Sequence, residues 1–266
     1  MAIQAVRIGS LEYLRAEGIC APHAFTTRFG GVSKEHLSSL NLGMHRGDAP
    51  ENVMQNYNIM GSALGFDPEK CVLTRQIHTD VIRYVGLQDC AGLDHSVYPA
   101  CDGLITDVPG LCLTVFTADC TPVLLYDPVT GAVGAVHAGW RGTALDIAGK
   151  AVRAMADRFG CPPSRIRAAI GPNIAQCCFQ TDADVPEAML EAYGDEAGEY
   201  IRKDGEKYYV NLKAINALSL RRAGAVHIEV SDACTACQSH RFWSHRVTRG
   251  LRGSQGAMIV CKGGEA

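Results

Sequence analysis

Short apolar runs separated by turn-forming residues make up most of the middle of the chain. They cover residues 71–85, 102–107, 111–119 and 122–139, and their β-branched residues predict strands. The first run, "CVLTRQIHTDVIRYV", predicts two strands around a corner that contains His78. The last contains "DPVTG", which is typical of a hairpin turn between two strands.

The pattern becomes helical after Thr143. Apolar residues recur at three- and four-residue steps as far as Phe159, and "GCPP" then ends the helix. Further helices are predicted over residues 182–194 and 211–223, the second with Asn211 as its N-cap.

Two more strands are predicted over residues 165–172 and 226–234. Hairpin-like strands mixed with helices favour an α+β fold over a purely parallel α/β sheet. The chain has no internal repeat, low-complexity tract or linker, so we expect one domain over residues 1–266, of mixed β-sheets flanked by helices.

The composition excludes several classes of protein. The chain is 47% hydrophobic and 20% charged with a net charge of −3, which argues against a nucleic-acid or anionic membrane partner. It has neither a membrane-spanning run nor a signal-peptide pattern at its start. We expect a cytoplasmic protein, monomeric or homodimeric, whose 12 cysteines are mostly free, buried thiols.

Three segments place a metal-binding side chain where a strand meets a sharp turn. They are "TRQIHTD" with His78, "FTADCTPV" with Cys120 and "AVHAGWRG" with His137. The neighbouring Asp119 is expected to raise the pKa of a free Cys120 thiol, which favours a metal-bound thiolate over an unassisted nucleophile. Two imidazoles and a thiolate are a typical catalytic zinc set, but each histidine is equally compatible with a hydrogen-bonded place in the core.

A series of motifs then resembles one family. In chain order they are "TTRFGGVS", "NLGMHRGD", "RQIHTD", "DGLITD", "FTADCTPVLLYD", "AVHAGWRGT", "AAIGPNIAQCCFQ" and "DACTACQSHRFWSHR". They resemble the bacterial polyphenol oxidase, or laccase-domain, family, which is associated with purine nucleoside phosphorylase, adenosine deaminase and methylthioadenosine phosphorylase activities. The resemblance implies a fold related to the catalytic domain of cytotoxic necrotising factor. It also implies a metal, zinc or alternatively copper, held by His78, Cys120 and His137.

The histidine content of this chain does not fit a laccase with a multicopper cluster. A multicopper oxidase needs about ten histidines, many in H-x-H pairs, for its copper cluster. The chain has nine histidines and no H-x-H pair. Oxidase activity would therefore need a single copper in the three-ligand site, which is the weaker alternative.

Phosphorolysis of a purine nucleoside needs a phosphate site and groups that hold the ribose and the base. Arg28 and Arg141 lie beside glycines that allow close backbone approach, which suits an oxyanion. Asn41, Gln76 and Asp102 lie near predicted turns and are candidates for contacts with ribose or base, although each is equally compatible with a capping role. Zinc-activated water would serve adenosine deamination at the same site.

The C-terminal motif contains Cys234, Cys237, His240 and His245, and "QCCFQ" adds Cys177 and Cys178. A structural zinc here would be strained, because only two residues separate Cys237 from His240. We therefore expect this segment to form a wall of the active-site cleft, with Phe242, Trp243 and Arg246 available to stack on a purine. The next residues depart from the family pattern, since Val247 replaces its second arginine.

The leading prediction is a zinc-dependent enzyme that acts on purine nucleosides and phosphate. One alternative is a cysteine hydrolase that uses Cys120 and His137 without metal, such as an amidase that edits peptidoglycan precursors. A non-catalytic metal- or nucleotide-binding module is the alternative from another class.

Overall fold

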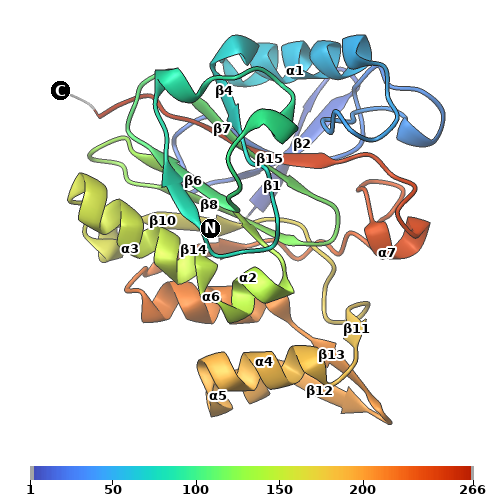
Figure 1. Ribbon diagram of the computed structural model, residues 1–266, viewed down its shortest axis with the longest axis vertical. Coiled ribbons are helices and arrows are strands. Elements are labelled where there is room, and N and C mark those ends of the chain that lie inside the picture. Colours follow the sequence, from blue (N-terminus) through green and yellow to red (C-terminus); the bar gives the residue numbers. More distant parts are fainter. Residues whose placement is uncertain (1–2, 265–266) are drawn as a thin grey trace.

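The computed structural model describes residues 3–264 (Figure 1). Two six-stranded mixed sheets pack against each other, and a three-stranded sheet lies at one end of the molecule. The first sheet has the order β1 (Ile3–Ile8), β2 (Leu11–Ala16), β3 (His23–Thr26), β15 (Gln255–Val260), β7 (Cys112–Thr117), β4 (Cys71–Leu73). The second has the order β14 (His227–Val230), β10 (Arg167–Ile170), β8 (Thr121–Tyr126), β9 (Val133–Ala138), β6 (Gly103–Thr106), β5 (Ile82–Tyr84). The small sheet has the order β11 (Gln180–Thr181), β13 (Lys207–Val210), β12 (Ile201–Asp204).

Helices cover the outer faces of both large sheets. The helices are α1 (Pro50–Leu64), α2 (Trp140–Ala144), α3 (Ile147–Phe159), α4 (Asp184–Tyr193), α5 (Asp195–Gly198), α6 (Leu212–Arg222) and α7 (His245–Thr248). In Figure 1, α1 packs on the first sheet, α3 and α6 on the second, and α4 and α5 on the small sheet. None of the described helices is long and apolar enough to cross a membrane.

The strands of the second sheet separate two hydrophobic cores. Because side chains alternate along a strand, Leu124 faces the core between the sheets, whereas Val123 and Leu125 face the core under α3 and α6. In β9, Val133 and Ala135 face the core between the sheets. His137 has the same parity, so its imidazole is directed to the same side, at the end of that core.

The predicted α+β class with mixed sheets is confirmed. The two strands expected within residues 71–85 are β4 and β5, but they belong to different sheets. The helices expected over 182–194 and 211–223 are α4 and α6, and the Asn211 side chain caps α6 by accepting a hydrogen bond from the Ala214 N–H at 3.2 Å.

The prediction of one helix from Thr143 to Phe159 is wrong at its start. The segment is divided into α2 and α3, because Asp146 adopts a left-handed backbone conformation with a φ of 62°. The Asp146 carboxylate accepts hydrogen bonds from the Ser219 hydroxyl at 2.6 Å and from Arg153 at 2.6 Å. These tertiary bonds compensate for the interrupted helix, and aspartate tolerates this conformation better than most residues.

The predicted hairpin turn between β8 and β9 depends on a buried ion pair. Asp127 is fully buried and accepts bonds from Arg165 Nε at 2.5 Å and Nη2 at 2.8 Å, and from the Thr130 hydroxyl at 2.7 Å. Burial disfavours the charged carboxylate, but these donors outweigh it and hold the Asp127 pKa well below its usual range.

Asp127→Asn should therefore lower the free energy of unfolding by about 2–3 kcal/mol, because it leaves a partly buried guanidinium without its anion. Urea titration at pH 7 measures this difference, with exposed Asp157→Asn as the control. Because the Asp127 pKa is lower in the folded than in the unfolded protein, the carboxylate stabilises the fold at pH values above its pKa in the unfolded chain. The difference in stability between wild type and Asp127→Asn should therefore become smaller as the pH falls below about 4. Equal unfolding midpoints at pH 7 would contradict this account.

Candidate metal and anion site

His78 lies on the connection from β4 to β5, where the chain passes from the first sheet to the second. The residue has a left-handed φ of 62°, which turns the chain sharply. The corner is held by the Asp102 carboxylate, which accepts the backbone N–H groups of His78 at 3.1 Å and Thr79 at 2.9 Å. These bonds to a buried anion compensate for the cost of the uncommon backbone conformation.

Cys120 lies on a second crossing, between β7 of the first sheet and β8 of the second. Here the left-handed residue is Asp119, with a φ of 86°. Its carboxylate accepts bonds from the Thr235 hydroxyl at 2.6 Å, the Ser244 hydroxyl at 3.1 Å and the Arg246 N–H at 2.7 Å. The corner that presents the thiol is thus held by the C-terminal part of the chain.

His137 comes from within β9 and is buried. Its Nδ1 lies 2.7 Å from Oδ1 of Asp102, and its backbone N–H donates to the Asp102 carbonyl at 2.7 Å. Because the carboxylate occupies Nδ1, the imidazole presents Nε2 to the site. Asp102 was expected to contact ribose or base; it is fully buried and orients His137 and the His78 corner instead.

The three predicted ligands converge. Their ligand atoms lie within 4.8 Å of one another, with 4.0 Å between His78 Nε2 and Cys120 Sγ. The imidazole rings of His78 and His137 are 5.0 Å apart and nearly perpendicular. A Cβ on Gly139 would lie 2.8 Å from the His78 ring, so only glycine fits at this position of "HAGW".

The charges within this group differ from the sequence expectation. Burial opposes ionisation of Cys120, but the His137 and His78 imidazoles outweigh it and lower the thiol's pKa to about 6. Burial also opposes protonation of His137, but the Cys120 thiolate and the Asp102 carboxylate raise its pKa to about 9. Asp119 therefore does not determine whether the Cys120 thiol is ionised, because its carboxylate bonds to the C-terminal part of the chain.

These three residues fit a metal ion. The donor set combines one thiolate with two imidazoles, and the bond from His137 Nδ1 to Asp102 leaves Nε2 as the nitrogen that would coordinate a metal once its proton is displaced. Three protein ligands leave a coordination position open, which is typical of a catalytic rather than a structural zinc site.

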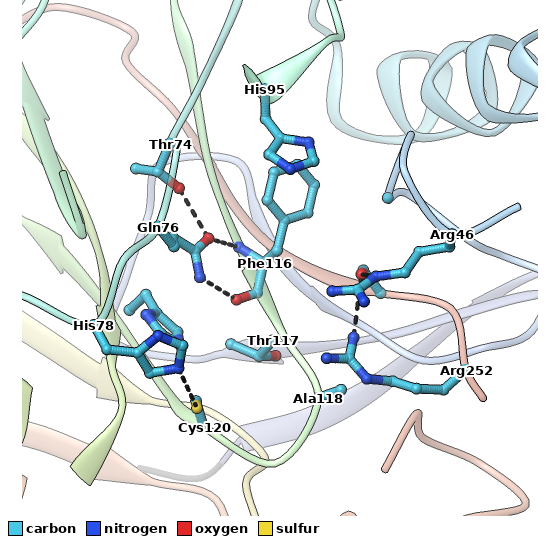
Figure 2. Close-up of a pocket in the computed structure, with 13 residues that line it drawn as sticks. Arg46, Thr74, Gln76, His78, His95, Phe116, Thr117, Ala118, Cys120 and Arg252 are labelled. Atoms are coloured by element: carbon cyan, nitrogen blue, oxygen red, sulfur yellow. Dashed lines mark hydrogen bonds between the residues drawn. The ribbon is translucent and has the colours of Figure 1, made fainter. Parts of the chain in front are cut away.

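The group opens into a cavity of about 150 Å³ (Figure 2). Its lining comprises Gly43, Arg46, Thr74, Gln76, His78, His95, Phe116, Thr117, Ala118, Cys120, His137, Arg252 and Ser254. Figure 2 shows His78 and Cys120 at one side and Arg46 and Arg252 at the opposite side. The cavity therefore combines a metal-binding group with positive charge.

The two arginines were missed in the sequence. Arg46 Nε and Arg252 Nη1 both donate to the Ser254 hydroxyl, at 3.2 and 3.3 Å. Within residues 3–264 neither guanidinium has a carboxylate in ion-pair distance, and the buried Nε of Arg252 has no hydrogen-bond partner. Burial and the charge of Arg46 lower the Arg252 pKa to about 10, as expected for like charges held together. Two guanidiniums that share a hydroxyl and lack a carboxylate partner are a candidate anion site.

A sequence signal for them existed. "HRGD" and "LRGS" place Arg46 and Arg252 beside glycines, the same feature that drew attention to Arg28 and Arg141. The feature occurs at several arginines, and only the fold decides which of them face the cavity.

Gln76 is the one predicted ribose- or base-binding residue in the cavity wall. Its amide donates to the Phe116 carbonyl at 2.8 Å and accepts the Phe116 N–H at 2.6 Å, so it fixes β7 beside the site. His95 packs against the Phe116 ring at 5.5 Å, and its buried Nδ1 has no partner in the described part of the chain. The cavity wall thus includes the Phe116 ring and the imidazole packed against it.

Asn41 and the other predicted arginines do not line the cavity. Asn41 is fully buried and bonds to the backbone of Gly43 and Ser254, which do line it. Its amide therefore supports the loops that carry the two cavity arginines.

The three arginines are used elsewhere. Arg28 stacks on Trp243 at 3.9 Å and donates to carbonyl groups, and Arg141 lies over the Trp140 ring at 4.2 Å. Arg246 donates to the carbonyls of Cys178 and Gln180, at 3.1 and 3.0 Å.

The expected stacking of a purine on Phe242 and Trp243 is wrong. Both side chains are buried, at 0% and 1% exposure, and the Trp243 N–H donates to the Leu40 carbonyl. The expected cleft wall of cysteines is not found either, since Cys177, Cys178, Cys234 and Cys237 do not line this cavity. His240 and His245 are exposed and do not join the cysteines.

Comparison with known proteins identifies the family of the chain. Residues 22–262 match the family described as multi-copper polyphenol oxidoreductase laccase. The chain belongs to this family. The resemblance found in the motifs is thereby confirmed.

Its relatives carry another name. The purine nucleoside phosphorylase YlmD of Geobacillus stearothermophilus is 38% identical over 244 residues, 88% of each chain. A purine nucleoside phosphorylase of Deinococcus radiodurans is 36% identical over 252 residues, 94% of this chain and 92% of that protein. The crystal structure of the Geobacillus YlmD matches with a TM-score of 0.91 at 36% identity, over 97% of this chain and 98% of that one.

Asp102→Asn should weaken zinc binding by about 10- to 100-fold, because the carboxylate that orients His137 and the His78 corner is lost. Competition with a chromophoric chelator measures the affinity. Asp107→Asn is a matched control, because Asp107 is exposed and follows the same strand, β6, that Asp102 precedes. Equal zinc affinity of the Asp102→Asn protein and wild type would show that the carboxylate does not position the ligands.

Proposed function

We propose that this protein is a metal-dependent purine nucleoside phosphorylase. One observation carries the proposal: a single cavity holds the His78, Cys120 and His137 group on one side and two arginines without a counter-ion on the other. This combination suits phosphorolysis, since an anion must be held close to the sugar while the leaving base accepts charge. The names of the relatives support the same reaction.

In this proposal Arg46 and Arg252 bind the attacking phosphate, in place of Arg28 and Arg141. Their guanidiniums are already held together through Ser254, so little side-chain entropy is lost when the anion binds. Neither guanidinium has a carboxylate in ion-pair distance among the described residues, so an anion would supply the missing negative charge. Charge-assisted hydrogen bonds from the guanidiniums would add to the attraction between opposite charges.

The metal in this proposal is zinc, because one thiolate and two imidazoles are a typical zinc ligand set that leaves one coordination position open. When bound, zinc supplies Lewis acidity to an oxygen of phosphate or water. This shared chemistry supports adenosine deamination and methylthioadenosine phosphorolysis as further activities of the same site. Asp102 keeps His137 in one tautomer, and the corner at Gly139 keeps the ligands close together.

The purine would lie against Phe116 and His95. The Phe116 ring gives the base an apolar contact, and the imidazole of His95 lies beside it in the same cavity wall. Gln76 keeps the Phe116 backbone fixed through two hydrogen bonds, so the ring has a defined place.

The test is turnover of adenosine, inosine, guanosine and methylthioadenosine by the purified protein, with and without phosphate. Free base and a ribose 1-phosphate should form only with phosphate, and deamination of adenosine should not need it. Arg46→Ala and Arg252→Ala should each lower phosphorolysis by about 10- to 100-fold, the value of a charge-assisted contact, and affect deamination far less.

Arg141→Ala provides the comparison with the sequence-based assignment, and Arg158→Ala, on the outer helix α3, is the control. A greater loss in Arg141→Ala than in the two cavity variants would move the phosphate site to α2. Absence of base release with every nucleoside in the presence of phosphate and zinc would refute the proposed reaction.

A second candidate has its own observation. Cys120, His137 and Asp102 form a chain of thiol, imidazole and carboxylate, and without metal the lowered Cys120 pKa and raised His137 pKa describe a thiolate–imidazolium pair. Such a pair suits a cysteine hydrolase, for example an amidase. In that mechanism His78 takes no direct part.

His78→Ala separates the two mechanisms. If the metal is needed, the variant should lose nearly all adenosine turnover at ordinary zinc levels, because a protein ligand contributes more than the roughly 10- to 100-fold of an outer hydrogen bond. Circular dichroism establishes that the variant is folded, and excess zinc should restore part of the activity. Full turnover by a folded, metal-free His78→Ala protein would leave the cysteine mechanism in place.

A further inference from the structure

Four cysteines outside the cavity meet at one point of the molecule. Cys177 and Cys178 lie in the turn that follows β10, and Cys234 and Cys237 lie in the loop that follows β14. Because β10 and β14 are parallel neighbours in the second sheet, the segments after them leave the sheet at the same edge. The bridge between Asn173 and Cys234 continues this pairing beyond the strands.

The spacing of the sulfurs is that of metal ligands. The Sγ of Cys237 lies 3.6 Å from that of Cys177 and 3.4 Å from that of Cys178, and the latter two are 3.7 Å apart. All four sulfurs, including that of Cys234, lie within 4.8 Å of one another. Four thiolates around a zinc at about 2.3 Å are about 3.8 Å apart, which is close to these values. A disulfide would need only about 2.05 Å.

Backbone donors and a buried cation complete the surroundings. The Sγ of Cys234 accepts the N–H of Ala175 at 3.3 Å and the N–H of Cys237 at 3.5 Å, and such donors favour a thiolate. The buried Lys213 ammonium is held by the carbonyls of Ser231 and of Ala233, the residue before Cys234. Zinc with four thiolates has a net charge of −2, which a neighbouring ammonium partly offsets.

We propose that Cys177, Cys178, Cys234 and Cys237 form a tetrahedral zinc site, separate from the His78, Cys120 and His137 group. The short spacing from Cys237 to His240 that argued against a zinc finger does not apply, because the other two ligands come from the neighbouring turn. Cys177 and Cys237 are exposed, so a metal ion can reach the sulfurs from solvent.

The site would link two segments that hold the corner at Cys120. Thr235, between the two C-terminal cysteines, donates to the Asp119 carboxylate at 2.6 Å and to the Asn173 carbonyl at 2.9 Å. The Ile174 N–H donates to the Asp119 carbonyl at 2.9 Å. A metal that joins these segments stabilises the residue directly before Cys120, so the role of the site is structural.

The first measurement is metal content after purification and zinc loading under reducing conditions. Wild type should hold about two zinc ions per chain, and the double variant His78→Ala with Cys120→Ala about one. Adding Cys177→Ser and Cys237→Ser to that double variant should remove the remaining ion, whereas adding Cys20→Ser, at an exposed thiol elsewhere in the chain, should leave it.

The second measurement remains decisive even if the cysteine variants fail to fold. Cobalt added to the metal-free His78→Ala and Cys120→Ala protein should give the strong visible absorption of tetrahedral cobalt with thiolate ligands at one equivalent. No such absorption in the reduced, folded protein, or a disulfide among the four cysteines that persists under reducing conditions, would overturn the proposal. Because the catalytic ligands are absent from this protein, the result is independent of the proposed phosphorylase activity.

Discussion

The site depends on one buried carboxylate. Asp102 is fully buried and accepts bonds from His137 Nδ1 and from the backbone N–H groups of Ile77, His78 and Thr79. Burial raises the cost of its charge, but these donors outweigh that cost and hold its pKa below the usual range. The same anion therefore stabilises the left-handed corner at His78 and orients the imidazole that faces it across the site. Two of the three candidate ligands lie in place because of one carboxylate that does not itself line the cavity.

The opposite side of the cavity shows the complementary constraint. Arg46 and Arg252 repel each other, and sharing the Ser254 hydroxyl does not neutralise them. Asn41 holds the loops that force them together, since its amide bonds to the backbone of Gly43 and Ser254. Residues held against mutual repulsion reduce stability unless an anion is bound, and this is a common property of binding sites. The fold thus keeps a thiolate on one side and an unbalanced positive charge on the other, with a small cavity between them.

Much of the chain was predictable from local pattern. The strands after residue 71, the helix capped by Asn211 and the hairpin turn at Asp127 all follow from periodicity and turn residues. The helix α1 carried an equally clear signal, with Pro50 at its first turn and Gly65 at its end, and was not predicted. The pairing of β3 with β15 joins residues more than two hundred positions apart, and no local signal encodes it.

The difference between local pattern and long-range arrangement also explains which residues of the site could be predicted. His78, Cys120 and His137 were found because each has a ligand side chain in a recognisable turn, and the motif order supported them. The sequence did not indicate which arginines line the cavity, because a glycine neighbour indicates a tight turn, not which side of the sheet the turn faces. Trp243 looked available for a substrate because its segment is rich in polar residues, yet its ring fills the space beneath Arg28.

The topology gives the reason why these ligands can form a site at all. His78 and Cys120 lie on two of the connections that cross between the large sheets, whereas His137 belongs to the second sheet alone. The distances among the three ligands therefore depend on how closely the sheets pack, and a Cβ at Gly139 would lie within 4 Å of all three side chains. The close-packed core between the sheets therefore fixes the ligand geometry, because it prevents the connections that carry His78 and Cys120 from moving apart. Substitutions in that core should thus change the site before they unfold the protein, which makes packing between the sheets a part of the active site's construction.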